Sequence, residues 1–429
     1  MKADHILEAA SRVSEAAELM TLHTVSETAS VSSPGGPIRT TLEESSCSIR
    51  IVRNGRIGSG ASSGRTAGPD LIDQAIALSR IGPEALFSLP GPSEPEPLDT
   101  EHPLVLQTGL EDLTGFLIGV ETELASRWPR SVVRGSISRR SVEVSVANTS
   151  GFEGSYRKSV LDLALAFTFA GRDGMTVRNS SFVTGLPLTD PARIVDGLLP
   201  CGPGVRRTGT PGGSVRAVLS PRVLSTLLQT IRSQAAGWTR DRGFSSFVEG
   251  QSLGSGLFTL HDRPRLPFGG ASAPFDAEGV PTADRCLVEN GVFLGHIHDL
   301  ASAARCGTGS TGSAGRNPGE MPVPVCTNLA MEAGGSSLED LLREAGEGLL
   351  ILELLPGVYG NAAGGDFRIP VSSAFTLSGG EASAPLRTGC FMEGNALDLL
   401  RSIAAVGDTL YGVETDRLPH VLVEGITVR

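Results

Sequence analysis

The sequence predicts an α+β protein with two domains, each built on mainly antiparallel sheets flanked by helices. Strand-like alternation of apolar and polar residues recurs along the chain, and the Asn-Gly pairs at residues 54–55 and 290–291 favour type I′ hairpin turns. Apolar residues at helical spacing separate these strands, as over residues 110–127. A stretch rich in glycine and proline at residues 200–213 then divides the chain.

This division places an N-terminal α+β domain at residues 1–205 and a C-terminal α+β domain at residues 206–429. The chain has 429 residues, of which 40% are hydrophobic and 19% charged, so both domains can bury a core. Its formal net charge is −11 and it has no long lysine or arginine run, which argues against nucleic acid or an anionic membrane as a partner.

The expected compartment is the cytoplasm. No apolar stretch reaches the length of a membrane span. The N-terminus has the pattern of an amphipathic surface helix, with apolar residues spaced from Ile6 to Met20, and not of a secretory signal. The six cysteines are scattered without a CxxC pair, which predicts reduced thiols.

Periodicity predicts further elements of the N-terminal domain. A loop rich in proline and glutamate is expected to cross the domain at residues 82–103, and a turn is expected at residues 148–151. The predicted strands lie at residues 48–53, 56–62, 142–146 and 161–169, and the predicted helices at residues 70–80 and 110–127.

The C-terminal domain is expected to open with a strand at residues 215–219 and a helix at residues 221–237. Ser220 is a good N-cap, Pro221 suits the first helical position, and Gly237 can close the helix. The remaining predictions are a hairpin over 286–289 and 292–298, a helix after a capping box at 337–340, a strand at 349–355, a helix capped by Asn395 and a strand at 420–428.

One histidine pair suggests metal binding. His296 and His298 alternate on a predicted strand, so their imidazoles would share a face and could hold a metal ion together. Asp299 adjoins them but points elsewhere if the strand continues, and neither HExxH nor HExxxH occurs in the chain. Because the ligand set is incomplete, a polar strand face is the favoured interpretation.

Two short motifs are weak. Residues 60–64 match GxSxG around Ser62, but they follow a hairpin and precede a loop, whereas a nucleophile elbow joins a strand to a helix. Residues 307–312 match GxGxxG without a surrounding βαβ unit. The first is interpreted as small residues at a strand end, and the second as a loop that offers backbone N–H groups to a peptide or an anion.

Several longer segments resemble the TldD/PmbA family. The most specific is ASAPFDAEGVPT at residues 271–282, which is similar to the family's S/T-PFD-x-EGV-x-T stretch. The other similar segments are the run from NGV at 290–292 through AAR at 303–305 to TGSAG at 311–315, GDF at 365–367, GNALD at 394–398 with AVGD at 405–408, and more loosely GSGASS at 58–63 and NTSG at 148–151. The resemblance spans nearly the whole chain and implies a PmbA/TldD-like fold.

The resemblance also implies where a zinc site would lie. TldD-type subunits hold zinc with an HExxxH helix and a cysteine near the C-terminus. In this chain Gln229 and Gln234 take the two histidine positions, Thr230 takes the glutamate position, and no cysteine follows residue 408. Amides and hydroxyls are poor zinc ligands, so we expect no metal and no catalytic residue in this chain. This pattern matches the TldE (PmbA) branch.

The leading hypothesis is therefore a non-catalytic, TldE-like subunit that pairs with a zinc-bearing TldD-type subunit and shapes a cavity for unfolded or modified peptides, or for peptide-like natural-product intermediates in biosynthesis. A homodimer is possible without that partner. We expect six residues to lie near the cavity: Asn148, Gly151, His296, His298, Gly312 and Asp366. The alternatives are a stand-alone peptide-binding or scaffold protein, and an independent metal-free hydrolase that uses His296 and His298 or Ser62.

Overall fold

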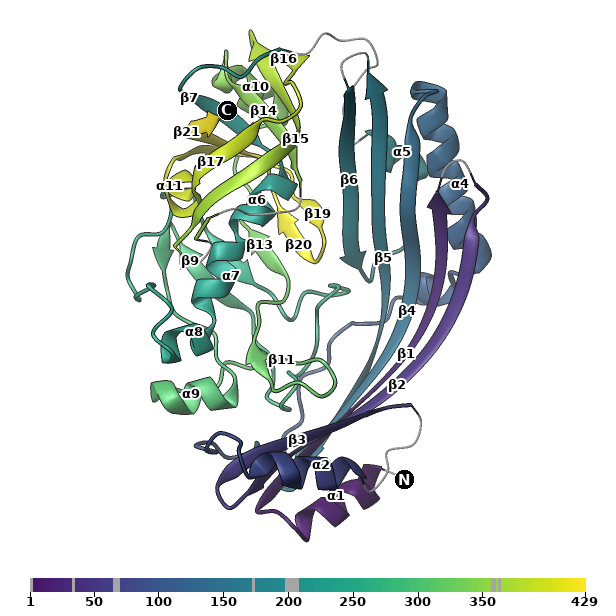
Figure 1. The fold of residues 1–429 in the computed structure, drawn as a ribbon, viewed down its shortest axis with the longest axis vertical. Helices are drawn as coiled ribbons and strands as arrows, with labels where there is room; N and C mark the ends of the chain where they lie inside the picture. The colour runs from purple at the N-terminus through teal and green to yellow at the C-terminus, as the bar shows by residue number, and fades with distance from the viewer. Residues whose placement is uncertain are drawn as a thin grey trace.

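The computed structural model describes residues 3–32, 35–64, 70–171, 174–196, 208–355, 360–361 and 364–429. It shows an α+β protein in which a long curved sheet from the N-terminal half faces a more compact C-terminal half (Figure 1). The predicted fold class is confirmed. The predicted boundary between residues 205 and 206 lies outside the described residues.

The N-terminal sheet has six strands in the order β3-β2-β1-β4-β5-β6, and every neighbouring pair is antiparallel. Its strands are β1 (Ala16–Ser32), β2 (Ile38–Arg53), β3 (Arg56–Ser63), β4 (Val132–Asn148), β5 (Glu153–Gly171) and β6 (Gly174–Thr184). β1 pairs with both β2 and β4 along almost its whole length, so the sheet forms one continuous wall.

Helices cover one face and one end of this wall (Figure 1). α4 (Leu110–Arg127) buries Leu113 and Leu117 in a cluster with Ile137 of β4 and Phe167 of β5. The other helices of this half are α1 (Ala3–Ser11), α2 (Asp70–Ser79), α3 (Pro103–Gln107) and α5 (Pro191–Asp196). α1 and α2 share a separate core with the ends of β1 and β2.

The C-terminal half contains a sheet that closes on itself. The strands run in the order β14-β7-β21-β17-β15, and β15 pairs back onto β14. They are β7 (Ser214–Leu219), β14 (Leu349–Leu354), β15 (Asp366–Ser378), β17 (Phe391–Asn395) and β21 (Val421–Val428), with β16 (Glu381–Pro385) and β18 (Ile403–Val406) added at the side. Only the pairing of β7 with β14 is parallel in this sheet among the described residues.

A second C-terminal sheet is made of short strands in the order β10-β9-β8-β13-β20-β19. They are β8 (Leu260–Asp262), β9 (Arg285–Glu289), β10 (Val292–Phe293), β13 (Leu329–Met331), β19 (Tyr411–Val413) and β20 (Asp416–Leu418), beside a ribbon of β11 (Ala314–Gly315) and β12 (Val323–Pro324). Loops connect most of them, so side-chain hydrogen bonds must fix much of this region.

The predicted helix at residues 221–237 is divided into three. Its start is confirmed, because Ser220 Oγ accepts a hydrogen bond from the Val223 N–H (3.3 Å). α6 (Pro221–Leu227) and α7 (Gln229–Ala235) meet at Leu228, and α8 (Gly237–Asp241) follows an extended Ala236 (φ −70°, ψ 123°). Gly237 therefore begins a helix instead of closing one, because its N–H donates to the Ile297 carbonyl (2.7 Å).

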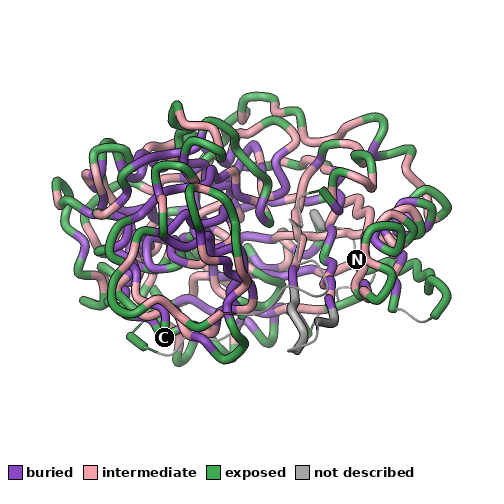
Figure 2. Tube along the Cα trace, turned by 90° about the horizontal axis from the view of Figure 1, so that it is seen from above, coloured by how far each residue is buried: buried purple, intermediate pink, exposed green. Residues whose placement is uncertain are grey.

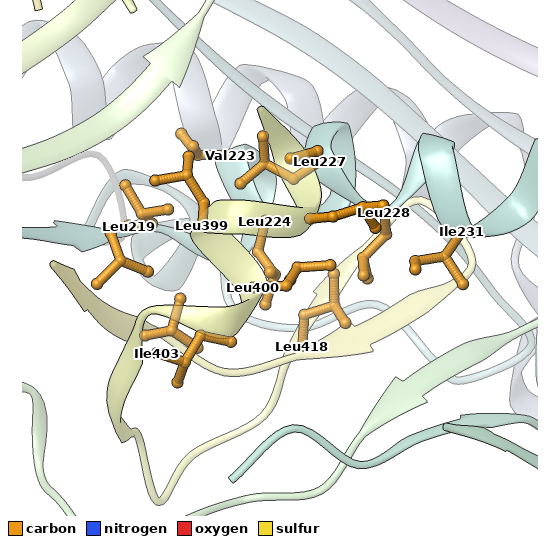
Figure 3. Packing of buried hydrophobic residues seen from close by; sticks show 14 of the residues in the cluster. Leu219, Val223, Leu224, Leu227, Leu228, Ile231, Leu399, Leu400, Ile403 and Leu418 are labelled. Carbon is orange, nitrogen blue, oxygen red and sulfur yellow. The ribbon is translucent and has the colours of Figure 1, made fainter. Parts of the chain in front are cut away.

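Leucines of α6 lie at the centre of the C-terminal core. Leu224 and Leu227 belong to one buried cluster with Leu400 of α11 (Ala396–Arg401) and Leu418 of β20 (Figure 3). The buried parts of the chain are concentrated in this half, whereas the N-terminal sheet is largely half-buried or exposed (Figure 2). Within the described residues, no helix has the length and apolar character needed to cross a bilayer.

Two sequence predictions were wrong in extent. The N-terminal helix ends at Ser11, and Ala17 and Met20 belong to β1, whose middle residues are half-buried and so give no clear alternation. The second hairpin strand ends at Phe293, because Gly295 (φ 152°) departs from extended backbone. The helices predicted at residues 110–127 and after the capping box, α10 (Leu338–Ala345), are confirmed.

Candidate functional site

The PFDAEGV segment forms a tight turn around a buried carboxylate. Asp276 Oδ1 accepts hydrogen bonds from the N–H groups of Glu278 (2.9 Å) and Val280 (3.0 Å), and Oδ2 accepts from the Ala314 N–H (2.9 Å). Burial, and then the nearby Glu278 charge, raise the pKa of Asp276 to about 7. The carboxylate thus joins two of the segments that carry the family resemblance, at residues 271–282 and 311–315.

Glu278 of this turn joins the two halves of the molecule through a buried network of charges. Its Oε1 lies 2.6 Å from Arg50 Nη1, and Arg50 Nη2 lies 2.9 Å from Glu18 Oε2. Arg316 Nη1 lies 2.8 Å from Glu18 Oε1, and all four side chains are at most 3% exposed. The two guanidinium groups balance the two carboxylates, so the network carries no net charge.

Sequence patterns did not predict this network. Glu278 was part of a recognised segment, but Glu18 and Arg50 lie on β1 and β2, and the part of β1 that carries Glu18 was predicted as helix. Arg50 and Glu278 are 228 positions apart in the chain, which no local pattern can bridge. The available signal was the position of Arg50 between Ile49 and Ile51, two apolar residues, where a buried charge needs a partner.

His296 and His298 line a surface pocket of about 350 Å³, and the chain joins this pocket to the charge network two residues later, where the Leu300 N–H donates to Glu278 Oε2 (2.7 Å). Their ring centroids are 6.3 Å apart, and the pocket is also lined by Arg240, Arg285 and Cys306. Burial, and then the Arg240 charge, lower the pKa values of both histidines, that of His296 to about 4. Both imidazoles are therefore neutral at pH 7.

Hydrogen bonding fixes the tautomer of each ring. Ser302 Oγ donates to the Asp299 carboxylate, so it can only accept from His298 Nδ1–H (3.2 Å), which leaves Nε2 as an acceptor. Ser245 Oγ donates to the Gln234 carbonyl (2.8 Å), so it accepts from His296 Nε2–H (3.3 Å). His296 Nδ1 is then an acceptor, buried without a hydrogen-bond partner among the described residues.

The pair does not form a complete metal centre. In the described part of the chain, no group of three or more histidine, cysteine, aspartate or glutamate side chains is placed to hold a metal ion. Asp299 is used as the N-cap of α9 (Leu300–Cys306), where it accepts from the Ser302 N–H (2.8 Å). The two acceptor nitrogens can instead bind a hydrogen-bond donor or a water molecule.

Asn148 and Gly151 build the turn between β4 and β5. The Asn148 side chain accepts from the Ser150 N–H (2.8 Å) and the Phe152 N–H (3.2 Å) and donates to the Pro90 carbonyl (3.0 Å). Gly151 has φ 98°, which favours glycine. This turn lies beside the PFDAEGV turn, because Phe152 packs edge-on against Phe275 (5.3 Å between centroids).

Gly312 and Asp366 occupy different places. Gly312 (φ 65°) lies against the Pro281 carbonyl, and a Cβ at this position would be only 2.3 Å from the carbonyl oxygen. Its neighbour Thr311 accepts a hydrogen bond from the His298 N–H through its hydroxyl (2.7 Å). Asp366 is exposed at the start of β15 and accepts from Asn395 Nδ2 (3.0 Å). Gly312 thus lies next to the histidine pocket, while Asp366 joins the GDF and GNALD segments in the sheet that closes on itself.

The side chains at the zinc positions that the family resemblance implies do not converge. Gln234 is buried, its Oε1 accepts from the Ser246 N–H (2.7 Å), and its Nε2 donates to the Phe244 carbonyl (3.4 Å). Gln229 is exposed at the start of α7, and Thr230 is buried beside it. One amide, one hydroxyl and one amide already bound to a loop do not fit a zinc ion, which prefers imidazole, thiolate and carboxylate ligands.

Neither of the two short motifs, GxSxG and GxGxxG, has the surroundings that its chemistry requires. Ser62 lies within the edge strand β3, paired with Cys47 of β2, so its surroundings are not those of a nucleophile elbow. Gly307 follows α9 in the left-handed conformation (φ 67°). The GxGxxG segment therefore comes after a helix, which was not predicted, and does not open one.

Comparison with known proteins identifies the C-terminal half. The family described as PmbA/TldA metallopeptidase C-terminal domain matches residues 212–429. Similar curated proteins include the metalloprotease PmbA homolog of Haemophilus influenzae (35% identical, covering 36% of this chain and 32% of that protein) and the metalloprotease TldD homolog of Buchnera aphidicola from Acyrthosiphon pisum (28%, covering 39% and 35%). These alignments span only about a third of each relative.

Two solved structures match over the whole chain. TldE from Thermococcus kodakarensis superposes with a TM-score of 0.89 at 20% identity, covering 99% of both chains. A protein from Thermotoga maritima described as a putative modulator of DNA gyrase gives a TM-score of 0.86, also at 20% identity and 99% coverage of both chains. At this identity the likeness establishes the fold.

Proposed function

Because the chain belongs to the PmbA/TldD metallopeptidase family, we propose that it is a non-catalytic, TldE-like subunit of a zinc metallopeptidase. Its partner is a TldD-type chain that carries the zinc ion and the catalytic acid–base group. The complex acts on unfolded or modified peptides or on peptide-like natural-product intermediates. In this chain the turn at Asn148 and Gly151, the histidine pocket with Gly312, and Asp366 contribute to the wall around the substrate.

One observation carries this proposal. At the positions that the family resemblance assigns to the zinc ligands, Gln234 is bound to the backbone at Phe244 and Ser246, and Gln229 is exposed. A zinc ion activates water only when its ligands leave one coordination position open and a base is near. Gln229, Thr230 and Gln234 supply neither the ligands nor the base, so the chemistry falls to a partner.

The test is co-expression with the TldD-type chain of the same organism. We expect the two chains to elute together in size-exclusion chromatography, with zinc bound in proportion to the TldD-type chain and peptidase activity only in the complex. Two chains that elute separately would favour the stand-alone peptide-binding or scaffold protein. Stoichiometric zinc in the isolated chain would overturn the proposal.

The same samples address the independent hydrolase. His298 lines a pocket and its Nε2 is an acceptor, and a general base needs both features. Under our proposal the isolated chain hydrolyses no peptide, with or without His298. Peptidase activity of the isolated chain that His298→Ala abolishes would support the hydrolase instead.

A further inference from the structure

The histidine pocket contains an unsatisfied hydrogen-bond donor, the guanidinium group of Arg285. Arg285 is half-buried, and its Nη2 donates to the Thr311 carbonyl (2.9 Å). Its Nε is buried without an acceptor among the described residues, and its Nη1 makes no hydrogen bond to them either but is not fully buried. Arg285 has no ion pair within the described chain, whereas Arg240 of the same pocket is paired with Glu249 (3.4 Å).

The same pocket contains an unsatisfied acceptor, Nε2 of His298. The His298 side chain is 3% exposed, and its Nδ1–H donates to Ser302 Oγ (3.2 Å). Nε2 makes no hydrogen bond to any described residue and, unlike Nδ1 of His296, is not fully buried. The ring is neutral at pH 7, because burial, and then the Arg240 charge, lower its pKa. A ligand in the pocket therefore meets a lone pair and not an N–H group.

Thr311 holds the donor and the acceptor beside each other. Its carbonyl accepts from Arg285 Nη2 (2.9 Å), its hydroxyl accepts from the His298 N–H (2.7 Å), and its own N–H donates to the His298 carbonyl (3.0 Å). The Arg285 charge is also close enough to contribute to the lowered pKa of His298. One cationic donor and one neutral acceptor thus line a single pocket of about 350 Å³.

A primary carboxamide is complementary to this pair of groups. Its carbonyl oxygen and one of its N–H groups lie on the same edge of a planar group, so one can accept while the other donates. A trans peptide bond directs its C=O and its N–H to opposite sides and cannot contact both groups in this way. A carboxylate would satisfy Arg285 but would turn a second acceptor towards His298 Nε2, and an ammonium group would meet the unpaired Arg285 charge.

We propose that the histidine pocket binds a primary carboxamide of the peptide substrate, with the carbonyl at Arg285 and an N–H at His298. This inference rests on the proposed function, which supplies peptides as ligands. The carboxamide belongs either to a glutamine or asparagine side chain or to an amidated C-terminus, and both present the same group. Leu294, which lines the pocket and is 45% exposed, offers an apolar contact to the neighbouring aliphatic part of the ligand.

The test uses the full chain and fluorescein-labelled alanine pentapeptides that end in a methylamide and carry glutamine, methionine or glutamate at the centre. Methionine is close to glutamine in length but has no amide. By fluorescence anisotropy at neutral pH we expect the glutamine peptide to bind about tenfold more tightly than the other two. A gain confined to an all-alanine peptide with a primary amide at its C-terminus assigns the site to that source instead.

Two outcomes of this comparison contradict the inference. One is that neither primary amide binds more tightly than its partner without one, which includes the absence of any binding. The other is that the glutamate peptide binds as tightly as the tightest amide peptide, because the pocket would then select a negative charge. The comparison uses the wild-type chain, so it holds even where a variant fails to fold.

Variants assign the effect to the pocket, with circular dichroism as the check on folding. His298→Asn keeps a donor for Ser302 Oγ and removes the Nε2 acceptor, so it should abolish most of the gap between the amide peptide and its control. Arg285→Lys keeps the charge but loses the planar donor fork and should reduce the gap. His23→Asn is the matched control, because His23 Nδ1 contacts Ser45 Oγ (2.9 Å) in the same manner but lies outside the pocket. A gap that both pocket variants leave intact overturns the inference.

The two proposals fail separately. A chain that forms the zinc-bearing complex but shows no preference for a carboxamide keeps its proposed function and loses this site. A chain that prefers the carboxamide in a His298-dependent way but never assembles with a TldD-type partner keeps the site and loses the subunit role.

Discussion

Each half of the molecule is stabilised internally by a different kind of interaction. The N-terminal sheet is made of strands in long uninterrupted registers, such as β1 with β2 and β4. The C-terminal half relies on short strands whose loops are tied by single buried side chains. The Asn328 side chain, for example, donates hydrogen bonds to the Arg263 carbonyl (2.8 Å) and the Ser272 hydroxyl (3.0 Å), and it accepts one from the Ala271 N–H (3.0 Å).

This difference explains where the recognisable sequence segments lie. A backbone ladder tolerates many side chains, because its hydrogen bonds are made by the main chain. A loop tied by one carboxylate or amide needs that side chain, as the turn around Asp276 does. The residues that carry the family resemblance in the C-terminal half therefore include many that hold loops, and the chemistry of binding must be sought beside them.

The largest expected effect comes from breaking the buried charges between the halves. Glu278→Gln leaves Arg50 and Arg316 with only Glu18 as a counter-charge in a site at most 3% exposed. We expect this variant to lose about 3–5 kcal/mol of unfolding free energy, because it buries an uncompensated charge. Urea denaturation followed by circular dichroism measures the loss.

The matched control is an exposed pair. Arg401 and Asp398 lie 2.9 Å apart with side chains 41% and 73% exposed, so Asp398→Asn should cost about 0–1 kcal/mol. The double variant Arg50→Met/Glu278→Gln, which restores charge balance, should recover part of the loss. Similar costs for Glu278→Gln and Asp398→Asn would mean that the two halves do not depend on the buried network.

The second expected effect is an inverted pH dependence from Asp276. Its pKa is about 7 in the folded chain, because of burial, and about 4 in an unfolded chain. The folded state therefore binds the proton more tightly, and this group lowers stability as pH rises from about 4 to about 7, by up to about 1.4 kcal/mol per pH unit. Asp276→Asn should remove this slope in urea titrations at pH 4.5 to 7.5.

Asp340 supplies the control for this slope. Hydrogen bonds from Ser337 and Arg343 lower its pKa, so its contribution changes only below pH about 4 and Asp340→Asn should leave the slope in place. A wild-type slope that persists in Asp276→Asn would show that another group titrates in this range. The carboxylate would then be held ionised by its three N–H donors.

The third expected effect comes from Gly237, the first residue of α8, which packs directly against His298. A Cβ at this position would lie 2.1 Å from His298 Nδ1 and 2.8 Å from the Ile297 carbonyl oxygen. Gly237→Ala should therefore displace the ring and cost about 1–3 kcal/mol, measured by thermal denaturation. Gly256→Ala, where no atom lies within 4 Å of the added methyl group, should cost less than 1 kcal/mol.

The histidine ring can be tested directly in the same background. If the clash with His298 dominates, the double variant Gly237→Ala/His298→Ala should be more stable than the sum of the two single changes predicts. Additive losses would assign the cost to the Ile297 carbonyl and to α8, and the histidine pocket would then be independent of this glycine.

Local patterns predicted those elements whose signal is local. α10 begins at the capping box that Ser337 and Asp340 form, and the Asn54-Gly55 turn has positive φ at both residues (50° and 69°). β1 was not predicted, because its middle residues, such as Thr24 and Ser26, are half-buried and polar and therefore show no alternation of apolar and polar residues. Long antiparallel pairing, not side-chain alternation, keeps that strand in the sheet.

The site was predictable to a smaller degree. The spacing of His296 and His298 placed two imidazoles together, but their tautomers depend on Ser302 and Ser245, which periodicity does not connect to them. A cavity of about 510 Å³ between the halves brings Arg178 and Arg193 next to Arg222, and only the closing of the two halves creates that juxtaposition. A sequence pattern indicates which residues share one face of a single helix or strand, whereas this cavity forms only when several elements pack together in the folded chain.

The smallest expected effect concerns Asn395, where the GDF and GNALD segments meet. Its Oδ1 accepts from the Leu397 N–H (2.9 Å) and Asp398 N–H (3.4 Å) at the start of α11, and its Nδ2 donates to Asp366 Oδ1 (3.0 Å). Asn395→Ala should cost about 1 kcal/mol, the usual cost of a lost N-cap. Asn395→Asp keeps the cap but faces the Asp366 carboxylate, so urea denaturation at low and high salt separates the two roles. If Asn395→Asp is as stable as wild type at low salt, only the N-cap contributes to stability. If Asn395→Asp loses unfolding free energy at low salt and salt reduces the loss, the contact with Asp366 holds the two segments together.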